Sequence, residues 1–190
     1  PTHPALSFRP GSIVRVACEH FVTYDAVEFR PGPHLNMIVG PNGTGKSTVV
    51  CAIALGLGWK PSVLGRAKDV ASYVKLGHSQ GWVEIELQGT ESNGTIRRIL
   101  FRESNTSDWM LQGVPASARQ VHQAVSQFNI EVGNLCAFLP QDRVADFAAM
   151  TPSKLLQDTQ HAAGHAQLSE WHAQLIDYGH QRAALDARLE

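Results

Sequence analysis

Gly40-Pro41-Asn42-Gly43-Thr44-Gly45-Lys46-Ser47 matches the spacing G-x-x-x-x-G-K-[ST] of a phosphate-binding loop. The glycines let such a loop wrap with its N–H groups pointing inward at the start of a helix, where they contact phosphate oxygens. An apolar run from Leu35 to Val39 precedes the loop, and apolar residues recur at helical spacing after it, as far as Gly56. We therefore expect an α/β fold of the P-loop NTPase type, in which a strand buried on both faces leads into the loop and its helix.

The residues of this loop have expected roles in binding ATP and Mg²⁺. Lys46 should reach the β- and γ-phosphates, which also makes it a candidate catalytic residue, and the Ser47 hydroxyl should coordinate Mg²⁺. Thr48 follows the metal ligand and is expected at the α-phosphate. The predicted nucleotide-binding residues of this stretch are Asn42, Gly43, Thr44, Gly45, Lys46, Ser47 and Thr48.

A complete P-loop ATPase also holds its metal through a strand that ends in an aspartate. After the loop, the comparable apolar run is 135–139, and it leads into Pro140 and Gln141, with Asp142 too late to serve. No acidic pair is placed to act as a catalytic base. The sequence therefore predicts a nucleotide site whose metal-holding and water-activating parts lie on another segment, and we expect the chain alone to be inactive as an enzyme.

The remaining segments alternate between strand-like and helical patterns. Alternation predicts a strand over 13–18. An antiparallel meander is expected from three further segments with a hairpin turn at Ser92-Asn93-Gly94, namely 82–87, 95–102 and 109–112. A short amphipathic helix is expected over 118–128, and Thr151-Pro152 supplies an N-cap and a first-turn proline for another helix.

The last part of the chain has the periodicity of a coiled coil. Residues at alternating three- and four-residue steps form an a/d pattern: Leu168, Trp171, Leu175, Tyr178, Arg182, Leu185 and Leu189. An amphipathic helix that packs on its own domain is the alternative interpretation. The pattern reaches Glu190 without a glycine cap or a proline, so we expect the helix to continue in a longer chain.

Composition excludes little. Lys plus Arg is 16 against Asp plus Glu 17, which gives no overall nucleic-acid signal, although a local basic face stays open. The three cysteines are scattered among apolar neighbours, which is typical of buried reduced thiols in a cytosolic or nuclear protein. No apolar run is long enough to span a membrane, and no secretory signal precedes the first strand.

The order of these features resembles the N-terminal head half of the structural maintenance of chromosomes (SMC) ATPases, relatives of the ABC-type DNA-repair ATPases. The resemblance lies in a strand that ends in a phenylalanine motif at 16–21, the phosphate-binding loop, the meander, a glutamine-containing loop and an outgoing helix. It covers about residues 12–180, and its most specific stretches are 57–70 and 134–147. The resemblance implies an N-terminal lobe with an antiparallel meander and a mixed sheet. It also implies a leader over 1–11, a head half over 12–167 and the start of a coiled coil over 168–190.

The resemblance also implies roles for three residues outside the loop. Gln141 corresponds to the glutamine that completes Mg²⁺ coordination and senses the γ-phosphate, and a neutral amide oxygen suits a hard cation. Arg66 corresponds to an arginine that reaches toward the phosphates, although a surface arginine after Gly65 is the simpler alternative. Many members have a basic residue where this chain has Val22, which leaves Thr23 as the polar nucleotide-binding candidate there.

The implied partners are the C-terminal half of the same SMC protein, a partner SMC head, non-SMC subunits and DNA, with no membrane. The implied function is ATP-dependent head engagement on DNA in chromosome maintenance, DNA repair and recombination, in the nucleus and on chromosomes. Contact with DNA would be sequence-independent and salt-sensitive. Charges of this kind more often form an ordinary solvated face, and the candidates for DNA contact are Arg97, Arg98, Arg102, Lys60, Lys68 and Lys75.

Two other functions fit parts of the sequence. A self-contained P-loop kinase of a small metabolite would have this length, but it needs a metal-binding acidic strand and an arginine-bearing lid, and neither is visible. A non-catalytic scaffold that keeps an ATP fold for helical partners is the second alternative. Gly45, Lys46, Ser47 and Gln141 are intact, which favours nucleotide binding over a pure scaffold.

Overall fold

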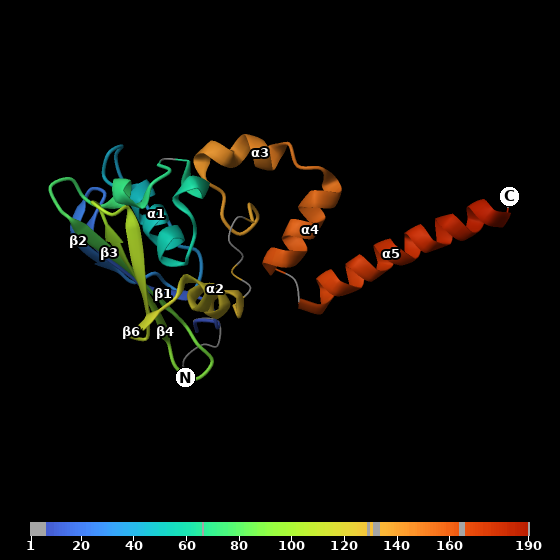
Figure 1. Ribbon diagram of the computed structural model, residues 1–190, viewed down its shortest axis with the longest axis horizontal. Helices are drawn as coiled ribbons and strands as arrows, with labels where there is room; N and C mark the ends of the chain where they lie inside the picture. The colour runs from blue at the N-terminus through green and yellow to red at the C-terminus, as the bar shows by residue number, and fades with distance from the viewer. Residues whose placement is uncertain (1–6, 66, 129, 131–133, 164–165, 190) are drawn as a thin grey trace. The chain divides into compact units, whose positions relative to one another are not determined.

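The computed structural model describes residues 7–65, 67–128, 130, 134–163 and 166–189. The chain divides into two compact units, Pro1–Gly133 and Asn134–Glu190, each of which is described by itself. The first unit contains a β-sheet with its helices, and the second contains helices (Figure 1). Within the described ranges, no helix combines the length and the apolar character needed to cross a bilayer.

The sheet of the first unit has six strands in the order β2-β1-β3-β4-β5-β6, and every neighbouring pair is antiparallel. The strands are β1 Ile13–Phe21, β2 Tyr24–Phe29, β3 Gln80–Leu87, β4 Gly94–Phe101, β5 Thr106–Leu111 and β6 Val114–Ala116. The expected first strand and the expected meander are therefore confirmed, whereas β2 and β6 were not predicted. The described residues form an antiparallel sheet, not the mixed sheet that was expected.

The segment from Leu35 to Val39 is not a strand, so the prediction of a doubly buried strand is wrong for this chain. Leu35, Met37 and Val39 are 92%, 78% and 77% exposed. The apolar composition suits a strand, but no strand among the described residues pairs with this segment, so its backbone groups have no ladder to join. The apolar pattern predicts that the side chains of residues 35–39 are buried, but in this chain several of them are exposed.

Helix α1, Lys46–Gly56, begins at the phosphate-binding loop and packs on β1, β3 and β4 (Figure 1). The core beneath it is formed by fully buried residues such as Phe21, Leu55 and Leu100. Gly56 faces β3 so closely that a Cβ there would lie 2.6 Å from Cγ1 of Ile85. The absence of a side chain at Gly56 therefore lets the helix approach the sheet.

The connections around the sheet contain short helical segments. The 3₁₀ helices η2, Pro61–Leu64, and η3, Val70–Tyr73, follow α1. Helix α2, Ala118–Ser126, contacts β5. It begins with a capping box in which the Ser117 hydroxyl accepts from the Gln120 N–H and the Gln120 side chain accepts from the Ser117 N–H. This confirms the predicted amphipathic helix, which ends slightly earlier than expected.

The second unit is helical. It contains η4, Gln141–Arg143, and the helices α3 Val144–Ala148, α4 Pro152–Ala163 and α5 Ala166–Leu189. The Thr151 hydroxyl accepts a hydrogen bond from the Lys154 N–H at 3.3 Å, which confirms the predicted start of α4. Several apolar side chains of α5 are exposed, including Leu168, Trp171 and Leu175. An exposed apolar stripe of this kind is consistent with the predicted coiled-coil seam.

Candidate nucleotide-binding site

The phosphate-binding loop leads directly into α1, as the sequence predicts. Gly43 and Gly45 have φ values of 85° and 91°, and Gly45 is the N-cap residue of the helix. L-residues with side chains rarely adopt these backbone conformations, so the two glycines permit the path of the loop. The N–H groups of the first two helical residues, Lys46 and Ser47, lie where an α-helix offers no intrahelical acceptor, and they are available to an anion. The Thr48 N–H instead donates to the Gly45 carbonyl at 2.8 Å.

The Lys46 side chain folds back onto the loop. Its ammonium donates to the carbonyl oxygens of Gly40 and Pro41 at 2.7 and 2.6 Å. The Thr44 hydroxyl donates to the Pro41 carbonyl at 2.8 Å. The loop therefore holds a positive charge at the start of a helix whose partial charge is also positive, and both favour a bound phosphate.

The two hydroxyls that follow Lys46 have different surroundings. Ser47 is exposed, whereas Thr48 is 2% exposed and its Oγ1 lies 3.4 Å from Oγ1 of Thr23. The accessible Ser47 hydroxyl fits the predicted Mg²⁺ ligand, because a hydroxyl oxygen at this position can reach a metal bound to the phosphates. The structure thus brings Thr23 to the start of the P-loop helix, where the sequence placed it among the nucleotide-binding candidates.

Tyr24 also contacts the loop and was missed by the sequence analysis. Its hydroxyl donates to the Gly45 carbonyl at 3.1 Å. Partial burial raises the pKa of Tyr24, so the hydroxyl stays protonated and able to donate at neutral pH. Its position directly after the candidate Thr23 is the signal that the sequence offered for this residue.

Two further site residues were predicted from the sequence, Gln141 and Arg66. Gln141 is the first residue of η4 in the second unit, and its side chain is exposed. Arg66 lies outside the described residues. The roles of Gln141 and Arg66 therefore stay predictions.

Arg98 was named as a candidate for DNA contact, and the structure contradicts that role because the residue is only 7% exposed. Its Nη1 donates to the carbonyls of Leu55 and Trp59 at 3.2 and 3.0 Å, where α1 ends. Its Nε donates to the Ser107 hydroxyl at 3.0 Å. Burial lowers the pKa of Arg98 to about 10, so it remains charged at neutral pH and complements the negative end of the helix dipole.

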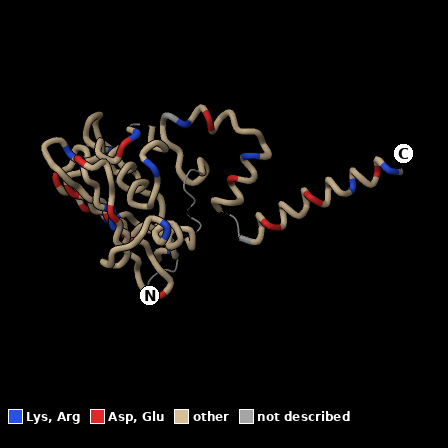
Figure 2. Tube along the Cα trace, viewed as in Figure 1, with Lys and Arg blue, Asp and Glu red and all other residues tan. Residues whose placement is uncertain are grey.

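The other basic residues of the meander also have partners within the chain. Arg97 forms an ion pair with Glu84 at 2.7 Å and lies over the Trp82 ring. Arg102 donates to the backbone carbonyls of His78 and Val74. Figure 2 shows Lys and Arg interspersed with Asp and Glu along the described part of the trace.

Three lysines complete the set of candidates for DNA contact. Lys75 forms an ion pair with Asp25 at 2.7 Å. Lys60 and Lys68 are exposed. Lys60 and Lys68 are therefore better candidates for contact with a DNA phosphate than the three arginines of the meander, which have partners within the chain.

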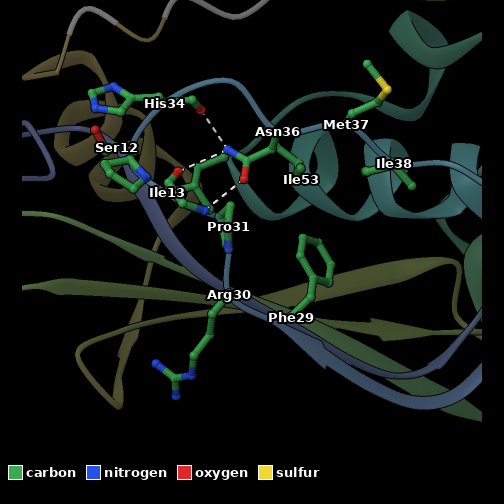
Figure 3. Close-up of a pocket in the computed structure, with 12 residues that line it drawn as sticks. Ser12, Ile13, Phe29, Arg30, Pro31, His34, Asn36, Met37, Ile38 and Ile53 are labelled. Atoms are coloured by element: carbon green, nitrogen blue, oxygen red, sulfur yellow. Dashed lines mark hydrogen bonds between the residues drawn. The ribbon is translucent and has the colours of Figure 1, made fainter. Parts of the chain in front are cut away.

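A cavity of about 570 Å³ lies beside the segment that precedes the loop (Figure 3). Its walls include Phe29 of β2, Ile53 of α1 and Ile38 of the exposed apolar segment. The Asn36 amide shapes one wall, because its Oδ1 accepts from the Gly32 N–H at 2.8 Å and its Nδ2 donates to the His34 carbonyl at 2.7 Å. The cavity is thus lined partly by apolar side chains of the exposed segment, which directly precedes the phosphate-binding loop in the sequence.

Comparison with known proteins identifies similar sequences. The sequence model described as AAA domain matches residues 15–185. The chain is 45% identical to structural maintenance of chromosomes protein 5 of Arabidopsis thaliana over 90% of its length. It is 42% identical to the protein of the same name from Schizosaccharomyces pombe over 88% of its length. It spans 16% of the length of each of these two relatives.

Solved structures show the same fold. A chain from a study of ATP-driven dimerisation and DNA-stimulated activation of SMC ATPases superposes with a TM-score of 0.68 at 20% identity, covering 80% of this chain and 99% of that one. An SMC head bound to the C-terminal winged-helix domain of ScpA superposes with a TM-score of 0.71 at 21% identity, covering 83% of this chain and 52% of that one. The resemblance and the fold class that the sequence indicated are thereby confirmed.

Proposed function

Because the chain belongs to the AAA domain family, we propose that it is the N-terminal half of an SMC-type ATPase head that binds ATP with Mg²⁺. The observation that carries the proposal is the loop at the start of α1, with Lys46 on its own carbonyls and Ser47 accessible beside it. Lys46 and the N–H groups of residues 42–47 would hold the phosphates, with Thr48 beside the α-phosphate. Bound Mg²⁺ would supply charge neutralisation at the β- and γ-phosphates.

The second part of the proposal is that the C-terminal half of the same protein covers the exposed apolar segment. Leu35, Met37 and Val39 lie exposed beside a cavity with apolar walls. A contiguous apolar patch of this kind is typical of a surface that another segment or protein covers. The chain also spans only 16% of its relatives, so most of such a protein lies elsewhere in sequence. We infer that strands of the C-terminal half, one of them ending in the acidic metal ligand, pair with residues 35–39.

The third part concerns larger partners. A partner head, that of structural maintenance of chromosomes protein 6, would close over the ATP and add a signature motif, with Gln141 and Arg66 of this chain reaching the metal and the phosphates. Non-SMC subunits would join the assembly, as ScpA does in the solved head complexes. Sequence-independent DNA binding, DNA repair and recombination, and location in the nucleus on chromosomes complete the proposal. The head half would cover residues 12–167, after a leader over 1–11, and the coiled coil would begin at residue 168.

An ATP titration tests the central proposal. The chain is co-expressed with the C-terminal half, and the wild type is compared with Lys46→Ala and with Lys60→Ala, which removes an exposed lysine near the other end of α1. We expect Lys46→Ala to weaken ATP binding about ten- to a hundredfold, because charge-assisted hydrogen bonds to the phosphates are lost. Lys60→Ala should bind normally. Equal binding by wild type and Lys46→Ala would refute the proposal and favour a scaffold.

A second measurement tests whether the site is composite. The chain alone should hydrolyse ATP at a negligible rate, since the described residues supply no acidic strand. Addition of the C-terminal half and the partner head should restore hydrolysis. Turnover by the isolated chain that depends on Lys46 would instead favour a self-contained P-loop enzyme.

A further inference from the structure

The β1–β2 hairpin brings its tip against the phosphate-binding loop. Phe21 pairs with Tyr24, so the tip consists of Val22 and Thr23. Val22 has a φ of 50°, a conformation that is rare for a β-branched residue. Such a backbone outlier persists where the surrounding structure fixes it, and it occurs often at functional sites.

The backbone around the tip follows from a bend at His20. The β1–β3 pairing ends at Glu19, and His20 then adopts a φ of 47°. The His20 carbonyl oxygen would lie 2.4 Å from a Cβ on residue 81, and the glycine there permits this approach. Beyond the bend, the Val22 N–H donates to the Tyr73 carbonyl at 2.9 Å. Beyond the β1–β3 pairing, the hairpin tip is thus attached to the last residue of η3.

Side chains hold the tip to the same segment. The rings of His20 and His78 stack with their centroids 3.7 Å apart. The Lys75 ammonium pairs with the Asp25 carboxylate at 2.7 Å. Both strands of the hairpin are therefore fixed to residues 73–78, and Tyr24 lies between these contacts in the sequence. The position of its hydroxyl is set by the fold before any ligand binds.

The Tyr24 hydroxyl acts on one peptide group of the loop. The Gly45 carbonyl accepts from it at 3.1 Å and from the N–H groups of Thr48 and Val49 at 2.8 and 3.2 Å. In a trans peptide, a carbonyl and the N–H of the next residue point in opposite directions. A Gly45 carbonyl held by Tyr24 and the helix therefore directs the Lys46 N–H away from them, toward the side where a phosphate is expected.

Gly45 and Tyr24 also fit each other sterically. A Cβ on Gly45 would lie 2.5 Å from the Tyr24 hydroxyl oxygen and 2.7 Å from the ring carbon that carries it. The ring thus occupies the space that a side chain at position 45 would need. The glycine that precedes the lysine serves two purposes, because it also permits the φ of 91°.

We propose that Tyr24 is a positioning residue for ATP binding: its hydroxyl fixes the Gly45–Lys46 peptide so that the N–H groups at the start of α1 face the phosphates. This inference rests on the proposed function. In this proposal Tyr24 of β2, which is distant from the loop in the sequence, orients the N–H groups that would bind the phosphates.

The test is Tyr24→Phe in the complete protein, because this change keeps the ring and removes only the hydroxyl. We expect ATP and inorganic triphosphate to bind about fivefold more weakly, by similar factors, since one neutral hydrogen bond is lost and it acts on the phosphate donors. The thermal midpoint without nucleotide should stay close to that of the wild type. Tyr178→Phe, which removes the same atom from an exposed residue of α5, should change neither affinity.

The outcomes separate the inference from the function on which it rests. Unchanged triphosphate binding by Tyr24→Phe overturns the inference, as does weaker ATP binding that spares inorganic triphosphate. A lower midpoint with unchanged affinities indicates a purely structural residue and also overturns it. Failure of the wild type to bind ATP in a Lys46-dependent way overturns the proposed function itself, and the inference with it.

Discussion

The guanidinium of Arg98 lies 4.5 Å from the centroid of the Trp109 ring while donating to the carbonyls of Leu55 and Trp59. Trp109 is directly opposite Arg98 on the neighbouring strand. One buried cation therefore connects the end of α1 with two strands of the meander. We therefore expect the stability of the first unit to depend on this buried cation.

Replacing Arg98 with methionine should destabilise the protein by about 3 kcal/mol, because the carbonyls of Leu55 and Trp59 would lose a buried charged donor and the Ser107 hydroxyl would lose its hydrogen bond to Nε. Chemical denaturation of the complete protein measures the change. Arg119→Met is the matched control, since Arg119 is exposed on α2. Equal stability of the two variants would contradict the role of Arg98 as a buried hydrogen-bonding cation.

The three cysteines should differ in reactivity. Cys18 and Cys51 are buried and Cys136 is half-buried, and none of the three forms a disulfide. Burial also raises the pKa of Cys18 to about 11, which leaves little thiolate at pH 8. Titration with a thiol reagent at pH 8 should therefore label Cys136 first, and Cys136→Ser should remove the fast phase. Rapid labelling that persists in Cys136→Ser would mean that the core opens readily.

The ion pair between Lys75 and Asp25 should make stability depend on acid pH. The hydrogen bond and charge of Lys75 lower the pKa of Asp25 in the folded state. Its contribution is therefore present above the unfolded pKa of about 4 and is lost as the pH falls through the lower folded value. Urea unfolding should show wild type more stable than Asp25→Asn at pH 7, with the difference vanishing in strong acid.

Asp108→Asn is the control for this pH dependence, because Asp108 is exposed and has no ion pair within the ranges that the structure describes. Its stability should follow that of the wild type across the same pH range. A difference between wild type and Asp25→Asn that grows toward low pH would have the wrong sign for the proposed ion pair.

The exposed apolar segment should matter for assembly but not for the fold of this chain. Leu35→Lys should weaken co-purification with the C-terminal half at least tenfold, because burying an unpaired charge is costly. Leu76→Lys is the matched control, since Leu76 is 86% exposed and Leu35 is 92% exposed. Equal retention of both variants would argue that residues 35–39 are not the docking surface.

Sequence patterns predicted the elements whose partners are local. The glycine-rich loop, α1, the meander and the start of α4 all depend on contacts within short stretches, and each was found where the pattern indicated it. The prediction of a strand over 35–39 was wrong because an apolar composition favours burial, whereas a strand also needs a neighbouring strand. No described strand pairs with this segment. The burial of Arg98 could not be predicted from its position in the strand. Side chains alternate between the two faces of a sheet, but this alternation does not say which face is covered by a helix.

Tyr24 escaped prediction for a related reason. Its contact with Gly45 depends on the bend at His20 and on the close approach to Gly81, and neither leaves a periodic signal. Thr23 was predicted only through the resemblance to the SMC family. Positions that combine an unusual backbone angle with a long-range contact are those at which a single sequence is least informative.

The close approach of α1 to the sheet at Gly56 restricts how the helix can move. The helix has Tyr24 at its first turn and Arg98 at its last, and at Gly56 its backbone lies against Ile85 without an intervening side chain. Close packing leaves it no room to slide over the sheet. We therefore expect that a displacement of the phosphate-binding loop would be passed through α1 to the strands beneath it, rather than moving the loop alone.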